Sequence, residues 1–187
     1  MKNKYIYLVF SNTGTLLSKC INNITKDDYV HVSLSFDDTF SKMYSFGRVF
    51  TSNPIIGGLV EENLHGGVYK KFTNTKCLIY KIDITEEQYK LLVDELKLFF
   101  SEKRKYRYNF IGLIAMQLDK TIIRDNYYFC SEFISQLLIN SGIYETDKTP
   151  QFIKPSDLMK IENKEFIYEG LASNYTVYSD NDYSVVS

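Results

Sequence analysis

The chain has 187 residues, which suits one domain, and its 22 basic and 23 acidic side chains almost cancel. Balanced charge argues against electrostatic binding of nucleic acid, which requires a basic surface. A local basic run, Lys103–Arg107, follows an expected helix, where cations complement the helix dipole. A docking patch for an acidic partner or a lipid headgroup is the alternative interpretation of this run.

The sequence contains three cysteines, Cys20, Cys77 and Cys130. Their odd number and scattered spacing argue against a disulfide framework or a zinc site, and free thiols suit a reducing compartment. No segment reaches the roughly 18 apolar residues of a membrane span, and Met1–Phe10 lacks the features of a secretory signal. We therefore expect a cytoplasmic protein with no transmembrane segment, no metal and no cofactor.

The first part of the sequence predicts strands over Lys4–Phe10, Tyr29–Phe36 and Lys42–Phe46. Apolar and polar residues alternate along Tyr29–Phe36, which is typical of a strand with two different faces. Apolar residues at helical spacing predict a helix over Thr15–Ile24. Cys20 lies on the apolar stripe of this helix and is expected in the core.

A long glycine-rich loop is expected over Gly47–Gly67, and such loops in compact domains are often functional. Val68–Phe72 is expected to be a short strand and Cys77–Ile84 a longer one. Thr85–Gln88 has the sequence of a capping box, and the apolar residues behind it repeat at helical spacing. A helix is therefore expected through Ser101.

The remaining segments predict helices over Asn109–Leu118, Phe129–Asn140 and Pro155–Leu158, and strands over Glu165–Glu169 and Tyr175–Tyr178. Ser156 is expected to cap the third of these helices. This order of elements predicts an α+β fold with helices packed on an antiparallel sheet. One domain is expected over residues 1–178, followed by a polar tail over 179–187.

Two histidines, His31 and His65, are the candidates for a general base. His31 lies within an expected strand, and a rigid strand holds a base better than the loop that carries His65. The competing interpretation of His31 is a structural histidine on the polar face of its strand.

Cys130 lies at the expected start of a helix, where free N–H groups and the helix dipole favour a thiolate and can stabilise an oxyanion. The competing interpretation is a core cysteine, because Cys130 shares an apolar helix face with Phe133. If this face packs over the strand of His31, the two side chains can meet. Ser33 and Ser35 are small enough to let the helix approach.

The strand of His31 also predicts a sheet that is covered on both faces. Its fully apolar side carries Val30 and Val32, whereas His31 and Ser33 point to the other side. An apolar strand face needs a cover of its own. We therefore expect protein packed against each face.

Two motifs, Tyr29–Leu34 and Phe129–Phe133, carry the candidate histidine and the candidate cysteine in that order. With Asn109–Gly112 and Pro155–Leu158, they make the chain resemble the circularly permuted NlpC/P60 cysteine hydrolases. The resemblance is closest to the YiiX/YebB-like branch, which is distantly related to lecithin–retinol acyltransferase. It covers about Tyr5–Leu158, and the histidine-first order is the permuted one.

The resemblance implies a papain-like α+β core with Cys130 as nucleophile and His31 as base. The implied reaction is hydrolysis of an amide bond, of the peptide or peptidoglycan type, or of a related acyl bond. It also implies a polar third member on the strand after the histidine. Ser45 aligns there and orients an imidazole only weakly, and Glu61 or Glu62 are the alternatives.

The implied partner is a small peptide, an amino acid or an acyl substrate. Backbone N–H groups near the nucleophile are expected to hold the oxyanion, helped by the hydroxyl of Tyr29 or Tyr7. Tyr44 is a further candidate for contact with substrate.

Two other functions stay open from the sequence. A lipid acyltransferase or phospholipase would present exposed aromatic side chains near the cleft, for which Phe46, Phe50 and Tyr69 are candidates. A catalytically degenerate module would use the same cleft to bind a peptide or amino acid without cleaving it.

Overall fold

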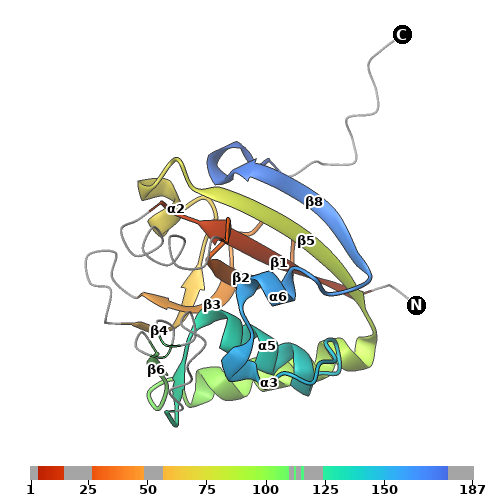
Figure 1. Cartoon of the computed structure of the whole chain (residues 1–187). Coiled ribbons are helices and arrows are strands. Elements are labelled where there is room, and N and C mark those ends of the chain that lie inside the picture. The colour runs from red at the N-terminus through yellow and green to blue at the C-terminus, as the bar shows by residue number, and fades with distance from the viewer. Residues whose placement is uncertain are drawn as a thin grey trace.

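The computed structural model describes residues 4–14, 27–48, 57–109 and 124–176, together with Gly112 and Ala115. Six strands form one antiparallel sheet in the order β4-β3-β2-β1-β5-β8 (Figure 1). Their bounds are Lys4–Asn12 for β1, His31–Ser35 for β2, Met43–Arg48 for β3, Gly57–Glu62 for β4, Lys76–Ile84 for β5 and Lys164–Leu171 for β8. An antiparallel sheet with packed helices confirms the predicted α+β class.

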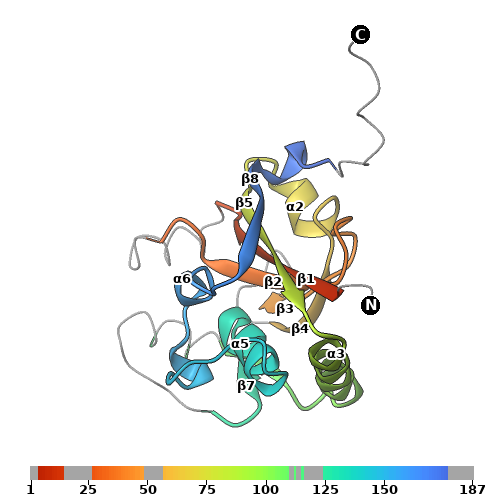
Figure 2. The same cartoon turned by 90° about the vertical axis from the view of Figure 1, so that its right-hand side faces the viewer.

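Helices cover the sheet from two sides (Figures 1 and 2). The helices α3 (Glu86–Ser101) and α5 (Cys130–Asn140) lie against one face, and the short α2 (Gly67–Lys71) lies on the other side. The remaining described elements are the parallel strands β6 (Arg107–Tyr108) and β7 (Tyr127–Tyr128), the helix α6 (Pro155–Leu158), and the 3₁₀ turns η1 (Pro150–Phe152) and η2 (Ala172–Asn174). In the part of the chain that the structure describes, no helix has the length and apolar character of a membrane span.

Alternation along β1 explains why both faces of the sheet are covered. Successive side chains of a strand point to opposite faces. Ile6 and Leu8 lie in the core beneath α3 and α5, whereas Tyr7 and Val9 lie in a second core that includes a residue of α2. None of these four residues is more than 4% exposed. The prediction of a sheet covered on both faces is confirmed.

The capping box predicted at the start of α3 is present. Thr85 Oγ1 accepts the Gln88 N–H at 3.1 Å, and Gln88 Oε1 accepts the Thr85 N–H at 2.9 Å. Leu92, Leu96 and Phe99 follow at helical spacing, and all three are buried. The helix therefore begins and packs as predicted.

The strand β4 lies inside the segment Gly47–Gly67, which the sequence predicted to be a loop. Its first residue has no room for a side chain, because a Cβ on Gly57 would lie 2.4 Å from the Gly47 carbonyl oxygen and 2.8 Å from Tyr108 Cβ. Glycine weakens a strand and gives no alternating pattern. The two glycines at the start of β4 therefore explain why the sequence pattern does not predict this strand.

The segment Val68–Phe72 was predicted to be a strand and forms the helix α2 instead. Tyr69 is the only buried residue among the five of this helix. One buried side chain in a single helical turn leaves too short a pattern to tell a helix from a strand.

Smaller differences occur near the end of the described chain. The carboxylate of Asp157, and not Ser156, caps α6 by accepting the Lys154 N–H at 3.0 Å. Tyr175 follows η2 and is not part of a strand, which contradicts the start of the strand predicted over Tyr175–Tyr178. Outside the described residues lie Thr15–Ile24 with Cys20, Phe50, most of Asn109–Leu118, and the predicted tail 179–187.

Candidate active site

His31, Ser33 and Glu62 lie on the same face of the sheet. Ser33 pairs with Val9 of β1, whose side chain belongs to the second core, and His31 precedes Ser33 by two residues on β2. Glu62 of β4 pairs with Met43, which lies in that core as well. The strand β3 separates β4 from β2, so Glu62 must reach across β3 to approach the other two residues.

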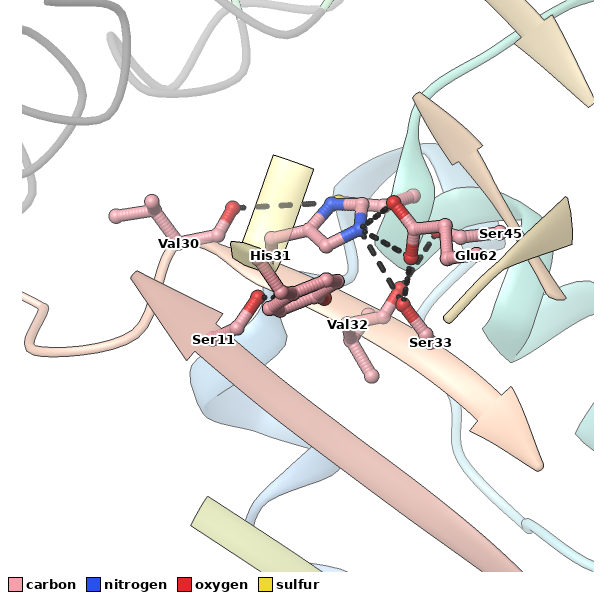
Figure 3. A network of polar contacts seen from close by, with 9 residues as sticks. Ser11, Val30, His31, Val32, Ser33, Ser45 and Glu62 are labelled. Carbon is pink, nitrogen blue, oxygen red and sulfur yellow. Dashed lines mark hydrogen bonds and ion pairs between the residues drawn. The ribbon is translucent and has the colours of Figure 1, made fainter. Parts of the chain in front are cut away.

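The Glu62 carboxylate contacts both of these residues. His31 Nε2 lies 3.2 Å from Glu62 Oε1 and 3.1 Å from Oε2. Ser33 Oγ donates to Glu62 Oε2 at 2.5 Å and lies 3.3 Å from His31 Nε2. Figure 3 shows the carboxylate between the imidazole ring and the serine hydroxyl. The carboxylate therefore fixes the ring through one nitrogen.

Gly47 of β3 leaves the space in which this contact forms. A Cβ at Gly47 would lie 3.6 Å from His31 Cε1 and 3.8 Å from Glu62 Oε1. A single methyl group would thus be in ordinary van der Waals contact with both residues, and any longer side chain would compete with them for the same volume.

Cys130 is the first residue of α5 and approaches His31 at the start of β2. The helix packs on the apolar face of β2, where Phe133 and Val32 share one core cluster. Cys130 Sγ lies 4.0 Å from the carbonyl oxygen of Val30, the residue before His31, and Cys130 is close enough to His31 to contribute to the raised pKa of the imidazole. The structure therefore brings Cys130 and His31 together.

The route of this approach differs from the predicted one. The sequence suggested that α5 passes over Ser33 and Ser35, but both residues face away from the helix because they alternate with Val32. Ser35 Oγ instead donates to the carbonyl oxygen of Asp37 at 2.8 Å. The cysteine reaches the histidine around the end of the strand.

The surroundings of His31 favour its charged form. Burial of the ring lowers the pKa of His31, but the negative charge of Glu62 and the interactions with Cys130 raise it by more. The net effect is a pKa of His31 well above its usual range. An imidazolium next to a cysteine favours the thiolate, which is the nucleophilic form.

The third member of the site differs from the first choice made from the sequence. Ser45 Oγ donates to the backbone carbonyl of Val32 at 2.7 Å and so does not orient the ring. Glu61 forms an exposed ion pair with Lys42 at 3.2 Å. Glu62, one of the two alternatives, makes the orienting contact.

The three tyrosines proposed as substrate contacts lie elsewhere. The hydroxyl of Tyr29 donates to Glu169 Oε1 on β8 at 2.8 Å. Tyr7 and Tyr44 sit near the other end of β2, opposite Ser35 and Leu34. The structure therefore does not gather these tyrosines around the candidate nucleophile.

The aromatic residues that would suit a lipid-binding surface are not exposed. Phe46 is fully buried beneath α5, and Tyr69 is buried in the second core. The structure thus removes two of the three aromatic residues on which the lipid hypothesis depended, and the third, Phe50, lies outside the described residues.

Ser33 is a member of the site that the sequence did not predict, since its small size was its only expected role. The signal that could have identified it is its alternation with His31, which places the two residues on one face of the strand. Among the residues that the structure describes, no group of three or more His, Cys, Asp or Glu side chains could hold a metal ion.

No protein-family model matches the chain, and no curated protein matches it either. The arrangement of Cys130, His31 and Glu62 therefore carries the argument about function.

Proposed function

We propose that this protein is a cysteine hydrolase of the papain-like, permuted NlpC/P60 type, which cleaves an amide bond of the peptide or peptidoglycan type, or a related acyl bond. The observation that carries the proposal is the meeting of Cys130, His31 and Glu62 at one end of β2. A nucleophile, a base and a group that orients the base are the parts that acyl transfer requires. The histidine strand precedes the cysteine helix, as in the permuted enzymes that the sequence resembles.

The two ring nitrogens of His31 have different partners in the proposed reaction. Nε2 of His31 is held by Glu62, which leaves Nδ1 for Cys130. In the proposed reaction His31 takes the thiol proton, and the thiolate attacks the carbonyl carbon of the substrate. His31 then gives that proton to the leaving group, and water hydrolyses the acyl-enzyme with the same residue acting as base.

The start of α5 supplies donors for the oxyanion. The first N–H groups of a helix have no acceptor within the helix, and they carry partial positive charge. Cys130 occupies the first position of α5, so its own N–H belongs to this set. A tetrahedral oxyanion formed at the thiolate would lie next to these groups.

One observation favours a second candidate function, a binding module without catalysis. Cys130 is only 3% exposed, as a core cysteine would be. In that case His31 and Glu62 would form a structural ion pair beside an inert thiol. The reactivity of Cys130 distinguishes the two functions, because a nucleophile must be reachable and must depend on its base.

The test is the rate of alkylation of Cys130 by iodoacetamide between pH 5 and pH 9, with the labelled residue located by peptide mass spectrometry. We expect the wild type to react at pH 6 at a rate close to that at pH 9. His31→Ala should react slowly at pH 6 and recover only at high pH. His65→Ala, which removes the other histidine, should behave as wild type. An inert Cys130, or a pH dependence that is the same with and without His31, would support the binding module.

A further inference from the structure

Two arginine side chains from separate segments come together at the small β6–β7 sheet. Arg107 of β6 is opposite Tyr127 of β7 in the register of this parallel pair, so their side chains lie on the same face. The guanidinium carbon of Arg124 lies 3.6 Å from the centre of the Tyr127 ring. Tyr127 therefore has Arg107 beside it on the neighbouring strand and Arg124 stacked on its ring.

Hydrogen bonds to the backbone help to fix both arginines. The Tyr127 N–H donates to the Arg124 carbonyl at 3.2 Å and closes the turn that places Arg124 over the ring. Arg107 Nη1 donates to the backbone carbonyls of Arg104 at 2.6 Å and Tyr106 at 3.1 Å. A guanidinium that is held in this way loses less conformational freedom when it binds a ligand.

The positive charge of the two arginines is not neutralised within the described part of the chain. No carboxylate there forms an ion pair with Arg107 or Arg124, whereas the nearby Lys105 pairs with Glu102. A guanidinium has five N–H donors in one plane, and stacking on a ring leaves them directed sideways. Arg107 uses only Nη1 in its bonds to described residues. The remaining donors suit a carboxylate or a phosphate, which guanidinium groups bind in a bidentate manner.

The arginine pair is close to the proposed nucleophile. Cys130 follows Tyr127 by three residues, and the chain between them is extended. Three extended steps span at most about 10 Å. A substrate about as long as an extended tripeptide covers that length.

We infer that Arg107 and Arg124 form a subsite for an anionic group of the substrate, a carboxylate or a phosphate. The inference rests on the proposed function for the reaction at Cys130. It narrows the substrate class to molecules that carry an oxyanion within about 10 Å of the scissile bond. It also gives a role to part of the basic run Lys103–Arg107, which the proposed mechanism does not use.

The first experiment measures binding without turnover. The chain has four arginines, so their Nε–Hε signals can be assigned in ¹⁵N-labelled protein and followed by NMR. Inorganic phosphate and succinate are titrated separately, and the tighter of the two identifies the preferred anion. We expect the signals of Arg107 and Arg124 to shift together, with one apparent Kd for each anion.

Variants test whether the oriented pair, and not net charge, binds the anion. Arg124→Gln should raise the apparent Kd roughly 3- to 10-fold, and Arg124→Lys, which keeps the charge without the planar fork, should restore only part of the affinity. Arg107→Gln should act like Arg124→Gln, which tests the same subsite if the Arg107 variant does not fold. Lys97→Gln is the matched control, because it removes one positive charge from an exposed position on α3.

The second experiment links the subsite to Cys130. The thiol is labelled with 6-maleimidohexanoic acid, which carries a carboxylate on a flexible arm, and with its neutral methyl ester. We expect the ratio of the acid rate to the ester rate to fall roughly 3- to 10-fold in Arg124→Gln and to stay unchanged in Lys97→Gln.

The inference would be overturned if neither anion shifts the two arginine signals, or if the acid-to-ester ratio is the same in Arg124→Gln and Lys97→Gln. A response to phosphatidylglycerol vesicles without a response to either small anion would overturn it as well, in favour of a membrane-docking surface. If Cys130 is inert while both arginines bind the anion, the hydrolase proposal fails and the pair remains the anion site of a binding module. If alkylation depends on His31 while no anion binds, only the subsite fails.

Discussion

Glu62 Oε2 lies 3.1 Å from His31 Nε2, although the two residues belong to strands that are not neighbours in the sheet. The contact spans β3 at Gly47, where a side chain is missing. The charge state of His31 is thus influenced by a residue that the register of the sheet alone would place two strands away.

Replacing Glu62 by Gln should shift the alkaline limb of the pH–rate profile of hydrolysis to lower pH. The carboxylate raises the pKa of His31, so its loss lets the imidazolium lose its proton sooner as pH rises. We expect hydrolysis, once a substrate is found, to lose the high-pH part of its pH profile, because the leaving group needs the imidazolium proton. Cys130 alkylation should become slower near pH 6 and keep its rate at high pH, as in His31→Ala. Glu61→Gln is the matched control, because Glu61 pairs with Lys42 at the surface. Equal profiles for the two variants would show that Glu62 does not set the charge of His31.

Substitutions at Gly47 should separate by size. Gly47→Ala adds one methyl group at ordinary contact distance from His31 and Glu62, so the protein should fold and keep its alkylation profile. Gly47→Val adds further atoms in the same space and should push Glu62 away from the ring. We expect the His31 titration midpoint, followed by NMR, to fall in the valine variant only. If valine leaves the midpoint unchanged, the space beside the pair is larger than the structure indicates.

Glu132 should make stability depend on pH. It follows Cys130 by two residues on α5, and burial raises its pKa from 4.5 to about 7. The folded state therefore binds this proton more tightly than the unfolded state, so this contribution to stability falls as pH rises from 4.5 to about 7. Relative to Glu132→Gln, we expect the wild type to lose about 2 to 3 kcal/mol of unfolding free energy between pH 5 and pH 8. Urea unfolding at both pH values measures this. A constant difference between the two proteins would contradict it.

Tyr29→Phe tests the revised role of this residue. The substitution removes the hydroxyl that donates to Glu169 and should lower the unfolding free energy by about 1 kcal/mol. Because the hydroxyl is directed at β8 and not at the nucleophile, we expect the Cys130 alkylation profile to stay unchanged. A reduced alkylation rate without loss of stability would contradict this and show that the Tyr29 hydroxyl contributes to the reactivity of Cys130.

Several parts of this arrangement could be predicted from sequence because local pattern determines them. The alternation of Val30, His31 and Val32 indicated the strand and the face of the histidine. The helical spacing behind Phe129 indicated the start of α5, and so the position of Cys130. The proximity of these two elements was a reasoned expectation, and the structure shows it.

The parts that could not be predicted depend on contacts between distant strands. Choosing Glu62 over Ser45 requires the path across β3, which exists because of the missing side chain at Gly47. The strand that carries Glu62 begins with Gly57 and Gly58, which give no pattern to read. A contact between residues of distant strands, such as that of Glu62 with His31, produces no repeating pattern in the sequence and therefore could not be predicted from it.

The two layers of the molecule contribute different halves of the candidate site. Cys130, the proposed nucleophile, comes from the α5 side of β2, while His31, the proposed base, and Glu62 lie on the α2 side. In the described residues the two halves meet where β2 begins, beside the Val30 carbonyl oxygen. In the proposed hydrolase, a change in how α5 packs on the sheet would therefore separate Cys130 from His31 without altering either residue.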